Sequence, residues 1–167
     1  MASQNFLDRY GGQTTEELIA LATEFRVDSL VLAFEEAIQD KSAEHPLSQE
    51  EGYVLAIEAL EREVNNGGYS QFFLNSSNAF AGTVVEALHA IGCSKTARIT
   101  ENAIAALRLE GELAPDRLEK VILSENETVL HELGECDKRY YDNDEPIADR
   151  LFEWIERNRA KIRVGLE

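Results

Sequence analysis

The chain has 167 residues, 44% of them hydrophobic, and its 32 acidic residues against 16 basic ones give a formal charge of −16. This length and apolar fraction exclude a disordered acidic tail and predict one domain with a real core. The negative excess repels nucleic acid and anionic membranes, so we expect no direct binding to either, and charged partners should be basic.

The cysteine count and the N-terminus indicate the compartment. Cys93 and Cys136 have neither metal-site nor Cys-x-x-Cys spacing and fall on apolar helical positions, so we expect reduced core thiols. The first ten residues contain no apolar signal region, and no stretch approaches the ~18 apolar residues of a membrane span. We therefore expect a cytoplasmic protein.

The first helices are predicted from capping residues and from two apolar faces. The sequence TTEE at residues 14–17 is typical of a helix start. The apolar residues within 18–25 and those within 30–38 would face different directions on one straight helix. Such a helix could not present both sets to a single core. We expect a break near Val27, with Asp28 or Ser29 capping the second helix of an N-terminal extension over residues 14–45.

The clearest helix of the chain follows Pro46. Ser48 and Glu51 have the spacing of a capping box. We expect Glu51 and Glu58 on the face opposite to an apolar face. The apolar face consists of Tyr53, Ile57, Leu60 and Val64, which are spaced four, three and four residues apart.

The rest of the chain shows helical periodicity between short breaks. Ser94 is the expected cap of one helix, Gly111 its end, and Pro115 suits the first turn of the next. Residues 124–127 offer a further capping box, so residues 115–142 form one helix or two. The other predicted helices cover residues 69–74, 84–91 and about 146–163. No segment shows sustained period-two alternation, which predicts an all-α, single compact multi-helix domain without a substantial sheet.

The segment from Glu63 to Ser77 is uncharged after its first residue and rich in amides and aromatic rings. It is followed by Val-Glu-Ala-Leu-x-x-Ile-Gly at residues 85–92 and by Leu-x-x-x-Asp-x-x-aromatic-aromatic at residues 133–141. Together these blocks resemble a family of small helical proteins of unassigned function, named for an acidic DNA-mimic protein. The resemblance covers roughly residues 50–142 and implies a helical fold. Its signature residues are Asn65, Asn66, Gly67, Gly68, Tyr69, Gln71, Phe72, Phe73, Asn75, Ser76 and Ser77.

Two interpretations of this signature remain open. In the structural one, Asn65 to Gly68 form a tight reversal between two helices, because Asn and Gly tolerate positive φ, and the amides satisfy exposed helix-end groups. Gly67 is then a candidate for positive φ. In the functional one, Asn65, Gln71 and Asn75 line a polar pocket for a peptide or small molecule.

Catalytic and metal-binding patterns are not found in the sequence. Glu86 and His89 have the Glu-x-x-His spacing of di-iron bundles, but no second copy exists. No nucleophile elbow, phosphate loop, zincin or dinucleotide fingerprint occurs. We expect no enzyme activity, no cofactor and no resident metal.

The acidic residues are concentrated in two blocks beside a nearly neutral centre. Residues 16–63 have a net charge of −10 and residues 119–149 of −7, whereas residues 64–118 have −1. This distribution predicts an acidic surface that competes with DNA for a basic DNA-binding protein, with a homodimer left open and a solvated face or scaffold role as the alternative. The candidate partner-binding residues are Glu35, Glu36, Asp40, Glu51, Glu58, Glu125, Glu132, Glu135 and Asp142.

Overall fold

The structure, a computed structural model, describes residues 4–165, and its regular elements in this range are helices. Within this range the only extended pairing is one isolated bridge between Asn5 and Phe25, so the all-α prediction is confirmed. The sequence predicts a single domain. Contacts between helices group the chain into two compact units, residues up to 58 with those from 146 on, and residues 59–145, which we describe one at a time.

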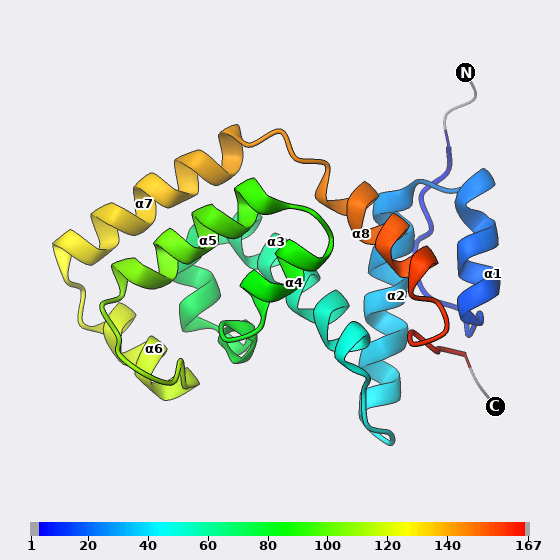
Figure 1. Ribbon diagram of the computed structural model, residues 1–167, viewed down its shortest axis with the longest axis horizontal. Helices are drawn as coiled ribbons and strands as arrows, with labels where there is room; N and C mark the ends of the chain where they lie inside the picture. The colour runs from blue at the N-terminus through cyan, green and yellow to red at the C-terminus, as the bar shows by residue number, and fades with distance from the viewer. Residues whose placement is uncertain (1–3, 166–167) are drawn as a thin grey trace. The chain divides into compact units, whose positions relative to one another are not determined.

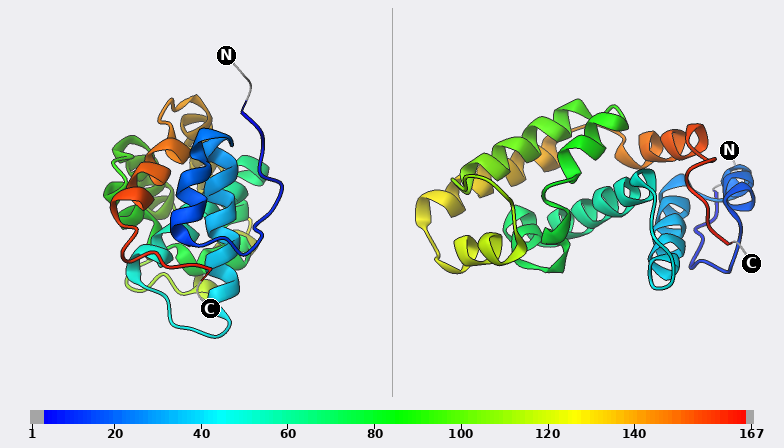
Figure 2. Two further views of the ribbon diagram at one scale, coloured as in Figure 1. Left: turned by 90° about the vertical axis from the view of Figure 1, so that its right-hand side faces the viewer. Right: turned by 60° about the horizontal axis from the view of Figure 1, so that its bottom comes forward.

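The first unit is built around the second helix of the chain. It contains α1 (Thr15–Ala20), the 3₁₀ turn η1 (Leu21–Thr23), α2 (Val27–Ser42), the start of α3 (Gln49–Leu74) and α8 (Ile147–Arg157). Helix α2 packs against α1 and α8, and Figure 2 shows α1 alongside α2. The side chains with no exposed surface in this core include Leu18, Leu30, Phe34, Ile38 and Ile155.

The capping predictions for this unit are partly right. The predicted helix start at residues 14–17 is present, and Thr14 caps α1 in a capping box with Glu17. The break before Val27 is present, but the N-cap of α2 is Arg26, so neither Asp28 nor Ser29 caps the helix. The Ser29 hydroxyl donates to the Arg26 carbonyl at 2.7 Å and accepts from the Leu7 N–H at 3.0 Å. Ser29 therefore holds the N-terminal segment, a role that local sequence does not reveal.

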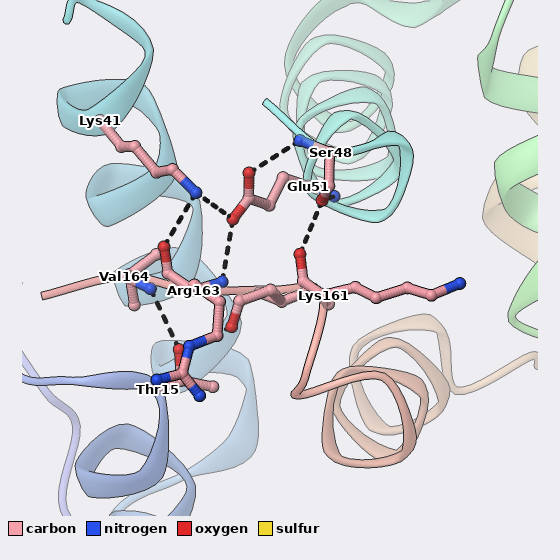
Figure 3. A network of polar contacts seen from close by, with 8 residues as sticks. Thr15, Lys41, Ser48, Glu51, Lys161, Arg163 and Val164 are labelled. Carbon is pink, nitrogen blue, oxygen red and sulfur yellow. Dashed lines mark hydrogen bonds and ion pairs between the residues drawn. The ribbon is translucent and has the colours of Figure 1, made fainter. Parts of the chain in front are cut away.

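Glu51 is a buried carboxylate in the first unit, and the prediction that it faces away from the core is wrong. It forms the expected capping box, because its Oε2 accepts from the Ser48 N–H at 3.0 Å. Its Oε1 accepts from Lys41 Nζ at 2.6 Å and from the Arg163 N–H at 2.9 Å (Figure 3). One carboxylate thus joins α2, α3 and the C-terminal segment.

The C-terminal segment is extended, whereas we expected helix to about residue 163. Helix α8 ends at Arg157, and the chain then runs beside α1 and the start of α3. The Thr15 hydroxyl donates to the Ile162 carbonyl at 2.6 Å and accepts from the Val164 N–H at 3.1 Å. Ser48 donates to the Lys161 carbonyl at 2.7 Å. These bonds replace the intrahelical ones.

The second unit contains the remainder of α3, the 3₁₀ turn η2 (Ser76–Phe80), α4 (Val84–Ala90), α5 (Ser94–Ala106), α6 (Pro115–Leu123) and α7 (Glu127–Asp142). Helix α5 lies beside α4 and α7 (Figure 1). The fully buried side chains of the second unit include Tyr69, Phe72, Phe73, Leu88, Leu118 and Leu133. Cys93 and Cys136 are buried and form no disulfide with each other, as expected.

Helix α5 differs from its prediction at both ends. Cys93 is the N-cap and Ser94 the first helical residue. The carboxylate of Glu145 accepts from the backbone N–H groups of Lys95 at 3.0 Å and Thr96 at 2.8 Å. The helix ends at Ala106, well before Gly111. The capping group thus comes from a residue distant in sequence.

The region from Pro115 to Asp142 forms two helices, which settles the alternative left open by the sequence. Pro115 occupies the first position of α6, as predicted. The cap of α7 is Asn126, whose side chain accepts from the Val129 N–H at 3.1 Å, and not Ser124.

Glu51 should be essential to the stability of the first unit. Replacing Glu51 with Gln should lower the free energy of unfolding by about 2–4 kcal/mol, because Lys41 loses its ionic partner, the fully buried carboxylate of Glu51. Urea denaturation measures this change. As a control, Glu44→Gln at an exposed position just beyond the end of α2 should change stability by less than about 0.5 kcal/mol. Equal effects of the two substitutions would contradict the assigned role.

Candidate functional site

Helix α3 is kinked at Gly67 and Gly68. Gly67 has φ −156° and ψ 18°, and Gly68 has φ 76° and ψ −175°. The prediction located the break between two helical stretches correctly, but the break is a kink rather than a tight reversal, and Asn65 and Asn66 precede it within the first stretch. Positive φ belongs to Gly68 and not to Gly67.

Two side chains of α7 satisfy the backbone groups that this kink leaves without intrahelical partners. The Tyr141 hydroxyl donates to the Val64 carbonyl at 2.6 Å. The Asp137 carboxylate accepts from the Tyr69 N–H at 2.7 Å. Asp137 and Tyr141 belong to the third block of the family pattern, so the first and third blocks meet at the kink. The sequence pattern contained both residues but gave no sign of this pairing.

Asp137 also explains why residue 68 is glycine. A Cβ on Gly68 would collide with the Asp137 carboxylate, and φ of +76° disfavours any residue with a Cβ. A Cβ on Gly67 would collide with the Gln71 side chain, which is flexible. The backbone constraint is therefore stronger at Gly68.

The polar side chains of the signature converge on the buried carboxylate of Glu63. Gln71 Nε2 donates to it at 2.7 Å, Asn75 Nδ2 at 3.0 Å and the Ser77 hydroxyl at 3.0 Å. Burial raises the pKa of Glu63, but these three hydrogen bonds outweigh that effect and lower the pKa below its ordinary range. The amides thus serve a carboxylate, and not the helix-end groups that we expected.

The aromatic residues of the signature form the core of the second unit. Tyr69, Phe72 and Phe73 have no exposed surface. The Tyr69 ring packs edge-on against Tyr140, with centroids 5.9 Å apart, and its hydroxyl is 2.8 Å from the Thr100 hydroxyl. These contacts anchor the second half of α3 to α5 and α7.

The remaining signature residues Asn65, Asn66 and Ser76 are exposed. The Asn65 amide donates to the Glu61 carbonyl one turn earlier at 2.7 Å. The amides proposed as a pocket floor are therefore engaged by the chain itself. A structural role accounts for them, and ligand binding at this segment stays a prediction.

Glu61 is a second carboxyl near the kink, and it is held very differently from Glu63. Burial raises the pKa of Glu61 to about 7. Its Oε1 is buried and has no hydrogen-bond partner within the described residues. Burial also raises the pKa of Asp137, against the opposing effect of the Tyr69 N–H. Sequence reasoning missed Glu61, because nothing in the pattern distinguishes it from a solvated glutamate.

Three of the nine carboxylates expected on a partner surface are buried. Glu51 has no exposed surface, and Glu58 lies within residues 53–60 of α3, which are buried on every side. Glu35 of α2 is 5% exposed. The apolar residues of α3 surround its axis, so the helix has no solvent face in this range.

The exposed carboxylates of α2 form a row. Glu36 and Asp40, both predicted, are exposed, and Glu44 just beyond the end of α2 continues their spacing of four residues and is also exposed. Glu36 Oε2 accepts from the Tyr10 N–H at 2.8 Å. We call Glu36, Asp40 and Glu44 the α2 acidic row. The spacing of four residues was the sequence signal that could have added Glu44.

In the second unit the predicted carboxylates are partly neutralised. Glu132 pairs with Arg108 and Glu135 with Lys138, each at 2.7 Å. The remaining two, Glu125 and Asp142, are exposed.

His89 Nε2 lies 3.5 Å from Glu101 Oε1. Between residues 4 and 165, no group of three or more His, Cys, Asp or Glu side chains is placed to hold a metal ion. In the same range no helix combines the length and apolarity needed to cross a membrane.

These features define an all-helical acidic protein with a glycine-kinked helix held by a distant aspartate and tyrosine. A comparison with protein families matches residues 45–158 to the DMP19-like protein family, and the chain belongs to that family. The match spans the first and third blocks and confirms the resemblance. Comparison with curated proteins and with solved structures gives no match.

Replacement of two glycines by alanine, one at the kink and one in α7, should have opposite effects on stability. Gly68→Ala should lower the free energy of unfolding by about 2–4 kcal/mol, because the Cβ meets Asp137 in a strained conformation. Gly134→Ala in α7, where a Cβ meets nothing within 4 Å, should raise it by about 0.5–1 kcal/mol. Thermal unfolding of both variants checks the pair. A Gly68→Ala protein as stable as the wild type would refute the assigned constraint.

Glu61 should make stability depend on pH. Its folded pKa of about 7 lies above the ordinary 4.5, so between these values the folded protein keeps a proton that the unfolded chain has lost. The free energy of unfolding therefore falls as pH rises from about 4.5 through 7 and stays lowered above that. Glu61→Gln removes this penalty.

Relative to the wild type, Glu61→Gln should gain about 1–3 kcal/mol more at pH 8 than at pH 5. Denaturant unfolding at the two pH values measures this difference, and Glu86→Gln at an exposed site is the control. A gain that is the same at both pH values would show that Glu61 is not protonated in the folded state.

Proposed function

We propose that this protein is an acidic protein-interaction module that competes with DNA for a basic DNA-binding protein. The α2 acidic row supports the proposal most directly, since it presents three exposed carboxylates at intervals of four residues, two on α2 and one just beyond its end. A competitor of DNA must share its compartment, which agrees with the cytoplasmic location expected from the sequence.

The spacing of the row suits a surface that reads phosphates. Side chains four residues apart on a helix are neighbours at about 6 Å. Phosphate charges on one DNA strand advance about 3.4 Å each along the axis while winding around it, so their separation is of the same order. A lysine or arginine placed to contact consecutive phosphates can therefore contact consecutive carboxylates.

The charge of the row is poorly balanced within the first unit. Lys41 is the nearest base in sequence, but its ammonium is bound by Glu51 at 2.6 Å and by the Arg163 carbonyl at 3.0 Å. Like charges four residues apart cost a helix about 0.2–0.5 kcal/mol per pair. The row therefore slightly destabilises its own helix and leaves negative charge for a partner.

The mechanism is competition for the same cationic groups. Carboxylates accept charge-assisted hydrogen bonds from lysine and arginine, as phosphates do. Each exposed ion pair is worth only about 0–1 kcal/mol, so several carboxylates must act together. The interaction should weaken with added salt, because the Debye length shortens to about 3 Å at 1 M. Glu125 and Asp142 offer separate contacts on the second unit.

A salt-graded pull-down tests the proposal. The immobilised protein is exposed to lysate of its source cell, and retained proteins are eluted by salt and, in parallel, by duplex DNA. We expect a basic DNA-binding protein to be released by both. Retention that neither salt nor DNA disrupts would count against electrostatic competition and favour the neutral signature segment as the binding surface.

Charge reversal should identify the surface. Changing Glu36, Asp40 and Glu44 together to Lys should reduce affinity for the captured partner at least tenfold, because the attractive row becomes repulsive. The matched control changes the exposed Glu86, Glu110 and Glu112 to Lys, which alters net charge equally. Fluorescence anisotropy measures both affinities. If the control loses as much affinity as the row variant, total charge and not the row explains binding.

A further inference from the structure

An open pocket of about 520 Å³ lies on the second unit between α5 and the end of α7. Three basic side chains line it: Lys95 and Arg98 from α5, and Arg139 from α7. Ile99 contributes an apolar wall, and Asp142 and Asp144 contribute carboxylates. Such a concentration of positive charge is unexpected in a chain with twice as many acids as bases.

The two arginines of this pocket are unpaired. Lys95 Nζ binds Asp144 at 3.1 Å. Within the described residues, neither the Arg98 nor the Arg139 guanidinium donates a hydrogen bond or forms an ion pair with a carboxylate. Arg108, by contrast, holds Glu132 at 2.7 Å. A guanidinium presents a planar set of donors that fits carboxylate and phosphate oxygens two at a time.

We propose that this pocket binds an oxyanion, the phosphate or carboxylate group of a small molecule, between Arg98 and Arg139. The volume falls within the range of small-molecule sites, which combine an apolar wall with a few charged groups. Ile99 and the aliphatic stems of the arginines supply the apolar surface. Asp142 opposes the anion and so weakens binding.

The overall negative charge of the protein does not prevent such binding. At physiological ionic strength the Debye length is about 8 Å, so distant exposed carboxylates are largely screened. The field at the ligand is therefore set by the groups that line the pocket, where three cations outnumber the two carboxylates of Asp142 and Asp144. This site is independent of the α2 acidic row, and neither proposal depends on the other.

Binding is measured by NMR titration of the ¹⁵N-labelled full chain with inorganic phosphate, citrate and adenosine monophosphate. Sodium chloride keeps the ionic strength constant. We expect saturable shifts at residues 94–99 and 139–144. Saturation with phosphate and the nucleotide alone assigns the oxyanion as phosphate, and saturation with citrate alone assigns a carboxylate. No saturable shift with any probe overturns the proposal.

Three variants make the test specific. Arg98→Gln with Arg139→Gln should weaken binding of the best probe at least tenfold. The matched control, Arg157→Gln with Arg159→Gln, removes two exposed arginines of the first unit and should stay within twofold of the wild type. Asp142→Asn should tighten binding severalfold, because it removes the opposing carboxylate. An equal loss in the control pair, or weaker binding by Asp142→Asn, overturns the proposal.

Discussion

The structure of the second unit depends on one constraint, the kink that Gly68 introduces into α3 and that α7 holds in place. Without the Tyr141 hydroxyl and the Asp137 carboxylate, the kink would leave a carbonyl and an N–H group without partners. With them, the helix changes direction where Tyr69 enters the core. The same change of direction brings the following amides to Glu63. The family signature therefore describes a self-contained structural device.

The sequence predicted the features that depend on neighbouring residues. The helix start at residues 14–17, the capping box of Ser48 and Glu51, and Pro115 at the first position of α6 are local, and they were found. The cap of α5 was missed because its acceptor, Glu145, lies about 50 residues away. The role of Asp137 at the kink was missed for the same reason. Capping rules describe a helix end, and not which distant side chain reaches it.

The candidate site was harder to predict, because a count of acidic residues is not a description of a surface. Three of the expected partner-binding carboxylates are buried, and Glu51 has an internal role between Lys41 and the C-terminal segment. Glu63 is likewise satisfied internally by its three donors. Acidic residues usually lie on the surface, so a prediction from the sequence places them there. A buried carboxylate requires hydrogen-bond donors from other elements, and these donors come close to it only in the folded chain.

This separation between structural and exposed residues decides how far family membership reaches. The aromatic residues that follow the kink, together with Glu63 and Ser77, are buried, so they constrain the fold and present little to a partner. The α2 acidic row and the arginine pocket lie outside these contacts. A chain could therefore keep the kink and its partners while losing the row, without a penalty in folding. Function in such a protein must be tested by changing exposed residues while the signature stays intact, because a change at Gly68 or Glu63 alters the fold and any activity together.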